Sequence, residues 1–235
     1  MMRVSLAIAL ALMVCVVVRG QDPKADEGFT AIFDGKSLDG WEGNPELWRV
    51  EEGALVGQTT KEKPTKGNTF LIWKGGEVGD FTLRAKFKIE GGNSGIQYRS
   101  KDMGKWVVNG YQADIDSTGR YMGILYEEGP GRRGILAERG TTVVIPAGGK
   151  PQVQKDANKA ADAKEIVAKL KKDDWNDYEI VAKGNHLVQK INGMVTVDVT
   201  DEDETKRAMS GILALQLHAG PPMKVQFKEI VLKKD

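Results

Sequence analysis

The sequence contains one cysteine and two histidines among its 235 residues, and this scarcity excludes several kinds of site. A chain whose only cysteine is Cys15 cannot form an internal disulfide or a cysteine-rich metal centre. His186 and His218 are too far apart in sequence to form a local zinc-binding pair. The chain also lacks a phosphate-binding glycine loop and a nucleophile elbow, so the usual signatures of nucleotide-binding proteins and serine hydrolases are absent.

The sequence also lacks an excess of charge of either sign. It has 34 Lys and Arg residues against 33 Asp and Glu residues, which gives a formal net charge of +1. Proteins that bind nucleic acid carry clustered basic residues that neutralise phosphates. We therefore expect no nucleic-acid partner.

The first twenty residues, "MMRVSLAIALALMVCVVVRG", have the pattern of a secretory signal. A basic start at Arg3 precedes an apolar run over residues 4–18, and the small residue Gly20 ends the segment. The run is shorter than the ~20 apolar residues that a membrane-spanning helix needs, so it favours a cleaved signal over an anchor. We expect a secreted or periplasmic protein without a membrane anchor, which begins with a flexible leader over residues 21–28.

Residues 29–235 are predicted to form a single all-β domain. Short runs of alternating apolar and polar residues recur along this region, separated by turns that draw on the 28 glycines. The clearest run is "FTLRAKFKI" over residues 81–89, and "WRVEEGALVG" indicates a hairpin that turns at Glu52-Gly53. Frequent turns between short strands favour an antiparallel β-sandwich over alternating βαβ units.

One segment departs from this pattern. Residues 155–172 are rich in Ala and Lys, and apolar residues recur there at helical spacing. We predict one amphipathic surface helix inserted into the sandwich, with Asp156 as its candidate N-cap.

Polar residues line the non-core face of several strands. The segment "GYQADID" puts Gln112, Asp114 and Asp116 on one face, where a surface strand more often carries Thr, Lys or Ser. Further candidates are Gln97 and Arg99 in "SGIQYRS", Gln216 and His218 in "GILALQLHAG", and Tyr126, Glu127, Glu128, Arg132 and Arg133 in "LYEEGPGRRG". Amides, carboxylates and guanidinium groups gathered on one face suit the many hydroxyls of a sugar, so we expect a carbohydrate partner.

Each of these residues also has a structural interpretation. Asp116 can cap a turn, Arg99 can form a cross-strand ion pair with Asp114, and His218 can hold the backbone of its loop. Two alternatives to an enzyme follow. A non-catalytic carbohydrate-binding module would use the same polar face without turnover, whereas a structural exported domain would have these side chains scattered.

Several longer segments resemble the 3-keto-disaccharide hydrolase domain family. They are "AIFDGKSLDGW", "GGNSGIQYRS", "GYQADID", "GILYEEGPGRRGIL", "WNDYEIVAKGNHLVQKINGM" and "GILALQLHAGPPMKVQFKEIVLK". The resemblance implies a concanavalin A-like jelly-roll β-sandwich and an exported enzyme that cleaves 3-keto-glycosides or 3-keto-disaccharides. Many family members have Glu and Gln where this chain has Gln112 and Asp114.

The chemistry implied by the resemblance needs one base. A ketone at C3 acidifies the C2 hydrogen, so its removal lets the C1 substituent leave, and water then adds to the enone. We expect Asp114 or His218 to be the base, Arg99 and Arg133 to stabilise the enolate, and Glu127 to donate a proton or bind sugar. A divalent cation held by Asp114, Glu127 and His218 is an alternative to the arginines. The remaining predicted substrate-binding residues are Gln97, Gln112, Tyr126 and Gln216.

Overall fold

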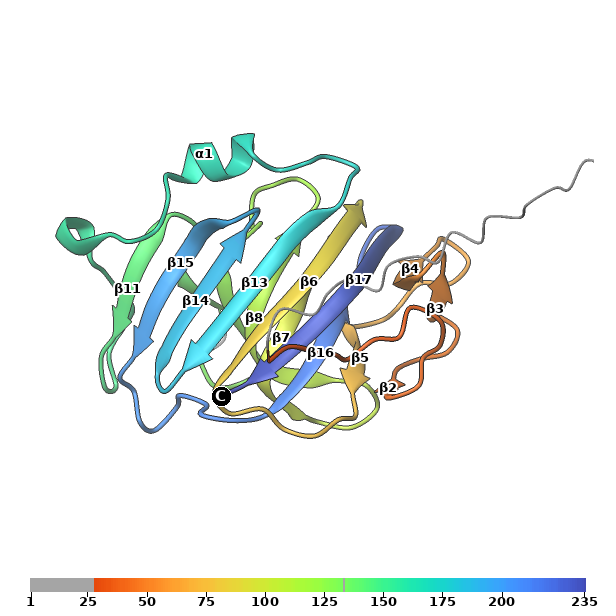
Figure 1. The fold of residues 1–235 in the computed structure, drawn as a ribbon, viewed down its shortest axis with the longest axis horizontal. Coiled ribbons are helices and arrows are strands. Elements are labelled where there is room, and N and C mark those ends of the chain that lie inside the picture. Colours follow the sequence, from red (N-terminus) through yellow and green to blue (C-terminus); the bar gives the residue numbers. More distant parts are fainter. Residues whose placement is uncertain (1–27, 133) are drawn as a thin grey trace, which may run out of the picture.

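A computed structural model describes residues 28–132 and 134–235 of the chain. Within these residues, the strands form two sheets of ten and seven strands, and Figure 1 shows the larger sheet in front of the smaller one. The predicted signal peptide at residues 1–20, the leader up to residue 27, and Arg133 lie outside the described residues. None of the described helices is long and apolar enough to cross a membrane.

The ten-stranded sheet has the order β12-β11-β15-β14-β13-β6-β17-β4-β3, with β1 paired to β17. Its strands are β1 (Thr30–Ala31), β3 (Trp48–Glu51), β4 (Ala54–Thr59), β6 (Phe81–Glu90), β11 (Thr141–Ile145), β12 (Gln152–Val153), β13 (Asn176–Lys183), β14 (His186–Ile191), β15 (Met194–Asp201) and β17 (Met223–Lys234). The described pairs are antiparallel except β11 with β15, which run parallel.

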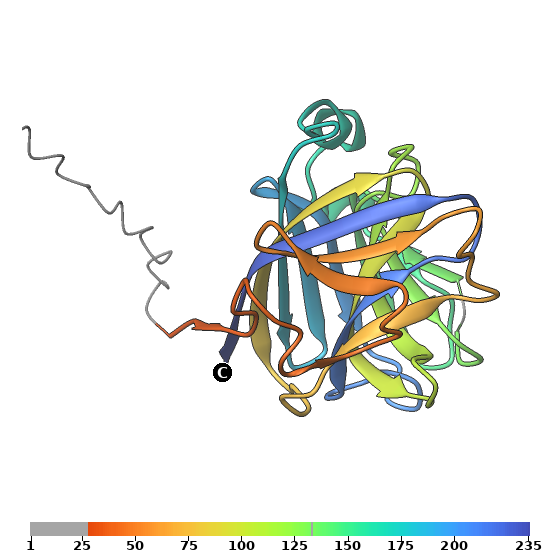
Figure 2. The same cartoon turned by 90° about the vertical axis from the view of Figure 1, so that its right-hand side faces the viewer.

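The seven-stranded sheet has the order β10-β9-β8-β7-β16-β5-β2. Its strands are β2 (Trp41–Glu42), β5 (Thr69–Trp73), β7 (Asn93–Asp102), β8 (Val108–Asp116), β9 (Leu125–Glu128), β10 (Gly134–Ala137) and β16 (Ile212–Leu217). The prediction of an all-β jelly-roll sandwich is confirmed by these two sheets, which are seen from a second direction in Figure 2.

The hydrophobic core lies between the two sheets and follows from the alternation of each strand. From the larger sheet it takes Phe81, Leu83, Ala85 and Phe87 of β6, and from the smaller sheet Tyr111, Ala113 and Ile115 of β8. Since side chains alternate along a strand, burying these residues turns Gln112, Asp114 and Asp116 to the opposite face of the smaller sheet. That face is called the outer face below.

The predicted helix over residues 155–172 is much shorter in the structure. It consists of a 3-10 turn at Lys155–Ala157 and the helix α1 at Ala163–Ala168, which lies beyond one end of the sandwich in both Figure 1 and Figure 2. The backbone between them is held on the edge of the larger sheet, because Lys159 N donates to Thr142 Oγ1 and Ala161 N to Val195 O. The N-cap of α1 is Asp162, not Asp156.

A β-bulge in β7 moves Arg99 off the outer face. The register shifts at this point against both β8 and β16, and Arg99 has a φ of +46°. Glycines on both sides of the bulge leave room for it, Gly110 within β8 and Gly211 immediately before β16. A Cβ on Gly110 would lie 2.4 Å from Ser100 Oγ, and a Cβ on Gly211 would lie 2.4 Å from the Arg99 carbonyl carbon. The expected shared face of Gln97 and Arg99 is therefore wrong.

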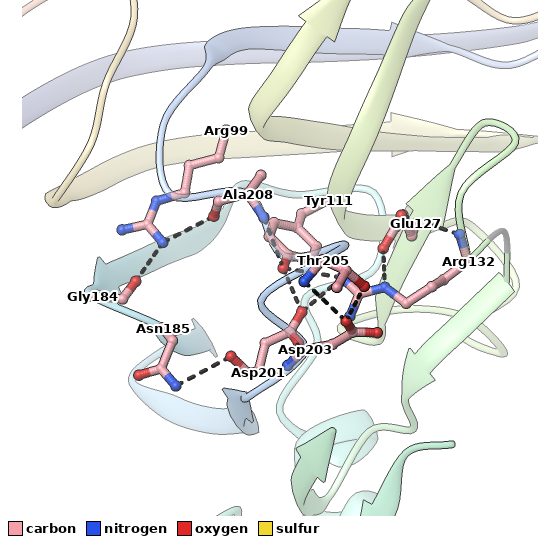
Figure 3. A network of polar contacts seen from close by, with 10 residues as sticks. All are labelled: Arg99, Tyr111, Glu127, Arg132, Gly184, Asn185, Asp201, Asp203, Thr205 and Ala208. Carbon is pink, nitrogen blue, oxygen red and sulfur yellow. Dashed lines mark hydrogen bonds and ion pairs between the residues drawn. The ribbon is translucent and has the colours of Figure 1, made fainter. Parts of the chain in front are cut away.

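The displaced Arg99 side chain binds loops at one end of the sandwich. Its guanidinium donates to the carbonyl oxygens of Gly79, Gly184 and Ala208 at 2.9, 2.6 and 3.3 Å. It also forms an ion pair with Asp80 at 2.9 Å, not with Asp114. Figure 3 shows the guanidinium directed at Gly184 and Ala208, so this arginine links loops that belong to both sheets.

We predict that Arg99→Met destabilises the fold by about 3 kcal/mol, because it leaves buried carbonyl groups without a donor. The matched control is Arg49→Met, since the Arg49–Glu51 ion pair is 44% and 38% exposed and should contribute less than about 1 kcal/mol. Urea unfolding of both variants measures the difference. Equal losses in the two variants would contradict the structural role of Arg99.

Candidate functional site

The outer face brings together most of the polar residues that the sequence singled out. Gln97 of β7 lies opposite Gln112 of β8, which lies opposite Tyr126 of β9. Gln216 comes from β16 on the other side of β7. The side chains of Gln97, Gln112, Asp114 and Gln216 are all buried, so each must find hydrogen-bond partners within the protein or a ligand.

A chain of amide hydrogen bonds joins these side chains, with Gln112 at its centre. Gln97 Nε2 donates to Gln112 Oε1 at 2.9 Å, and Gln112 Nε2 donates to Asp114 Oδ2 at 3.0 Å and to Gln216 Oε1 at 3.3 Å. Ser100 Oγ donates to Gln97 Oε1 at 2.7 Å. Because an amide has one accepting and one donating end, these bonds fix the orientation of all three glutamines.

Gly95 makes this arrangement possible. The Gln112 side chain lies across β7 at this position, and a Cβ on Gly95 would lie 2.5 Å from Gln112 Cγ. Any other residue would push Gln112 away from Gln216 and Asp114. In the segment "GGNSGIQYRS", Gly95 thus allows the Gln112 side chain to lie close to β7. The same segment supplies Asn93, which binds Asp114.

Asp114 is the titratable group at the centre of the outer face. It is 4% exposed, and its Oδ1 accepts from Asn93 Nδ2 at 2.5 Å while Oδ2 accepts from Gln112. Burial raises the pKa of Asp114 to about 7; the hydrogen bonds from Asn93 and Gln112 lower it, and the charges of Asp116 and Glu128 raise it further. A carboxyl group that titrates near neutral pH can both accept and return a proton.

A second carboxylate reaches the same network, and it belongs to Glu128. Its Oε1 accepts from Gln216 Nε2 at 3.0 Å and from Asn68 Nδ2 at 2.9 Å. The Asn68 side chain is itself positioned by the loop after β16, because its Oδ1 accepts from Ala219 N at 3.1 Å. The network therefore runs from Asp114 to Glu128 across four strands.

The structure does not place Glu127 on this face. Glu127 pairs in register with the inward-facing Tyr111, and its carboxylate accepts from Arg132 Nε at 2.9 Å. The Arg132 guanidinium also donates to Tyr111 Oη at 3.1 Å and forms an ion pair with Asp201 at 2.6 Å, and Figure 3 shows these side chains gathered together. Burial and the Asp201 carboxylate raise the pKa of Tyr111, so its hydroxyl stays protonated. This network ties the two sheets together.

His218 follows β16 in the direction of Asn93 and is half-buried. Its Nδ1 lies 2.5 Å from the carbonyl oxygen of Ala219, which fits an Nδ1–H donor. In the neutral ring, this leaves Nε2 with a free lone pair. The structural interpretation of His218 therefore holds for Nδ1, whereas Nε2 makes no hydrogen bond with the residues that the structure describes.

Asp116 shares the outer face but serves the turn that follows β8. Its Oδ2 accepts from Thr118 Oγ1 at 2.6 Å and from Tyr121 N at 3.0 Å. This contact confirms the interpretation of Asp116 as a turn cap.

The cation alternative does not fit these positions. Among the residues that the structure describes, no group of three or more His, Asp or Glu side chains is arranged to hold a metal ion. Of the three expected ligands, Glu127 faces the core side of the smaller sheet, whereas Asp114 faces its outer side. Of the two predicted donors, Arg99 is displaced from the site by the bulge, and Arg133 lies outside the described residues.

Sequence reasoning missed Asn68, Asn93 and the role of Glu128. A signal for Glu128 was available, since Leu125 is a core residue and alternation from it turns Glu127 inward and Glu128 outward. Asn68 and Asn93 reach the site from a loop and a strand start. Their contribution depends on which strands are neighbours, which one sequence does not show.

Solved structures share the fold at low sequence identity. A glycosyl hydrolase candidate from Parabacteroides distasonis aligns with a TM-score of 0.57 and 19% identity over 88% of this chain and 99% of that one. The carbohydrate-binding module CBM66 from Bacillus subtilis aligns with a TM-score of 0.56 and 15% identity over 83% of this chain and 96% of the module. At these identities, the likeness defines the class of fold, a β-sandwich.

The family follows from the sequence match. Residues 28–233 match the profile of the 3-keto-alpha-glucoside-1,2-lyase-like domain, and the chain belongs to this family. A 3-keto-disaccharide hydrolase of Bacteroides thetaiotaomicron is 30% identical over 95 residues, which are 35% of this chain and 31% of that protein. The matched part is thus about a third of the curated relative.

The raised pKa of Asp114 predicts how the stability of the fold depends on pH. The folded chain holds this proton more tightly than the unfolded chain, whose carboxyl has its ordinary value of 3.8. Asp114 therefore contributes most to stability below about pH 4, and the contribution is lost as the pH rises through about 7. Asp114→Asn cannot titrate, so its stability relative to the wild type should increase between pH 4 and pH 8. Urea unfolding across this range measures the trend, and a constant difference would contradict the shifted pKa.

Proposed function

We propose that this protein is an exported enzyme that cleaves 3-keto-glycosides by elimination and hydration, with Asp114 as the base. The observation that carries the proposal is the position of Asp114, a nearly buried carboxyl with a pKa of about 7, at the centre of a polar outer face. The family match supports the substrate class. Export rests on the signal-like residues 1–20.

The reaction begins at C2 of the oxidised sugar. The ketone at C3 acidifies the C2 hydrogen, and the Asp114 carboxylate takes this proton while the C2–H electron pair forms the enolate. The enolate then restores the C3 carbonyl, forms a C1=C2 double bond and expels the C1 oxygen substituent. Since Asp114 titrates near neutral pH, it is about half ionised at pH 7 and can act in this step.

Hydration completes the cycle. Water adds its oxygen to C1 of the enone, and the proton held by Asp114 returns to C2. The leaving oxygen takes up the proton that this water loses, directly or relayed through His218 Nε2, which makes no hydrogen bond with the described residues. The sum is a 3-keto-glycoside plus water giving a 3-keto sugar and an alcohol, and Asp114 ends in its starting state.

The enolate oxygen needs a hydrogen-bond donor. Arg99 cannot supply it, because its guanidinium is committed to Asp80 and three carbonyl groups. Of the described residues on the outer face, Tyr126 carries a hydroxyl with no hydrogen bond in the structure and lies beside Gln112 in register. We assign the donor role to the Tyr126 hydroxyl.

We predict that Asp114→Asn lowers kcat on a 3-keto-glucoside by about 10³-fold, because it removes the base but keeps the size of the side chain. The matched control is Asp116→Asn, which changes a carboxylate on the same face that caps a turn and should keep kcat within about threefold. A carbohydrate-binding module would bind the oxidised sugar without turnover in the wild type. Full activity of Asp114→Asn would rule out Asp114 as the base.

The proposal also predicts a pH profile. Because the base acts as the carboxylate, kcat/KM should rise with pH and reach half its plateau near pH 7. Initial rates between pH 5 and pH 9 measure this limb, and buffer blanks correct for spontaneous elimination at high pH. A rate that is constant from pH 5 to pH 7 would contradict a base with the pKa of Asp114.

A further inference from the structure

Asn93 is a direct partner of Asp114 that still has an unused polar atom. Its Nδ2 donates to Asp114 Oδ1 at 2.5 Å, whereas its Oδ1 makes no hydrogen bond with the residues that the structure describes. The other side-chain partner of Asp114, Gln112, uses both hydrogens of its amide nitrogen and is only 1% exposed. Asn93 is half-buried, so of these two partners it is the one that a ligand beside Asp114 can contact.

The position of Asn93 is fixed by the two-glycine turn that precedes it. Gly91 and Gly92 have φ values of +69° and +64°, which glycine adopts without strain. A Cβ on Gly92 would lie 2.9 Å from Met223 Cβ, so the turn packs closely against the start of β17. The Gly92 carbonyl oxygen accepts from Ser117 N at 3.1 Å and from Ser117 Oγ at 2.9 Å. The turn is therefore held on two sides, and β7 begins at a defined place beside the end of β8.

The side chain of Asn93 lies on the outer face with Asp114. Asn93 is opposite Asp116 in register and two residues before Gly95, which is opposite Asp114. In the proposed reaction, C2 of the sugar carries both the hydrogen that Asp114 removes and a hydroxyl group. Because the two are bound to one carbon, a C2 hydrogen directed at the Asp114 carboxylate brings the C2 hydroxyl next to the groups that hold this carboxylate. A hydroxyl can donate to an amide oxygen, and Asn93 Oδ1 offers one.

We propose that Asn93 binds the C2 hydroxyl of the oxidised sugar, with its Oδ1 accepting from this hydroxyl while its Nδ2 stays on Asp114. The inference rests on the proposed function, because it takes Asp114 as the base at C2. A single amide then holds the base and the carbon that it deprotonates in a fixed relation, which favours the proton transfer. Asn93 thereby confers a preference for 3-keto-glycosides that have a hydroxyl at C2 over their 2-deoxy analogues.

The test compares methyl 3-keto-glucoside with its 2-deoxy analogue, in which the ketone at C3 still acidifies the hydrogens at C2. The measured quantity is the ratio of the two kcat/KM values, the 2-hydroxy sugar over the 2-deoxy sugar. Asn93→Ala should lower this ratio by about fivefold or more relative to the wild type, because it removes the acceptor of the C2 hydroxyl. Damage to the fold or to the base affects both sugars alike and cancels in the ratio.

Two further variants sharpen the test. Asn93→Asp keeps an acceptor oxygen at this position and loses the donor to Asp114, so its rates on both sugars should fall while the ratio stays within about twofold of the wild type. A ratio as low as that of Asn93→Ala would overturn the acceptor role of Oδ1. Asn158→Ala, at the exposed C-cap of the 3-10 turn, is the matched control and should leave the ratio unchanged.

An unchanged ratio in Asn93→Ala would overturn the assignment of Asn93 while leaving Asp114 as the base. If the wild type turns over neither sugar, the proposed function fails, and calorimetric titration with the two sugars tests Asn93 separately. A binding preference for the 2-hydroxy sugar that Asn93→Ala loses would support the contact. A preference that Asn93→Ala keeps, or a wild type that does not distinguish the two sugars, would overturn it.

Discussion

The candidate site depends on one side chain amide, that of Gln112. It is buried, so each of its polar atoms needs a partner, and its three contacts go to Gln97, Asp114 and Gln216. Because its oxygen accepts from Gln97, its nitrogen must face Asp114 and Gln216. This single orientation of Gln112 positions Asp114, the proposed base. It also makes Gln216 accept from Gln112, so that the Gln216 nitrogen donates to Glu128. The missing side chain of Gly95 is what allows Gln112 to lie across β7.

The requirement that a buried polar group find hydrogen-bond partners also explains why Arg99 lies outside the site. A bulge adds one residue to β7 and turns the guanidinium away from Asp114 toward three carbonyl groups and Asp80. Without those acceptors a buried guanidinium would carry a large desolvation cost. Among the described residues, the displacement of Arg99 also leaves Asp114 without a cation that lowers its pKa. Its pKa can therefore rise under burial, which an adjacent arginine would oppose.

Much of the fold could be predicted from the sequence because it depends on local alternation. Strands such as β6 and β8, and the turn at Glu52-Gly53 with φ values of +50° and +77°, follow from short patterns. The bulge could not be predicted, since it depends on Gly110 of the neighbouring strand β8 and on Gly211, which immediately precedes β16. The length of α1 was missed for a similar reason, because contacts with β11 and β15 hold the preceding residues extended.

Two adjacent glutamates have different partners because they face opposite sides of the smaller sheet. Glu127 faces inward and joins Arg132 in a network that ties the sheets, whereas Glu128 faces outward and joins the Gln216 network. Glycosidases that use two carboxyl groups hold them about 5–10 Å apart across one bond. Here two amide groups lie between Asp114 and Glu128, and Asp116 is committed to its turn. The elimination proposed for this protein needs one base with a near-neutral pKa and no paired carboxylate, and Asp114 meets that requirement.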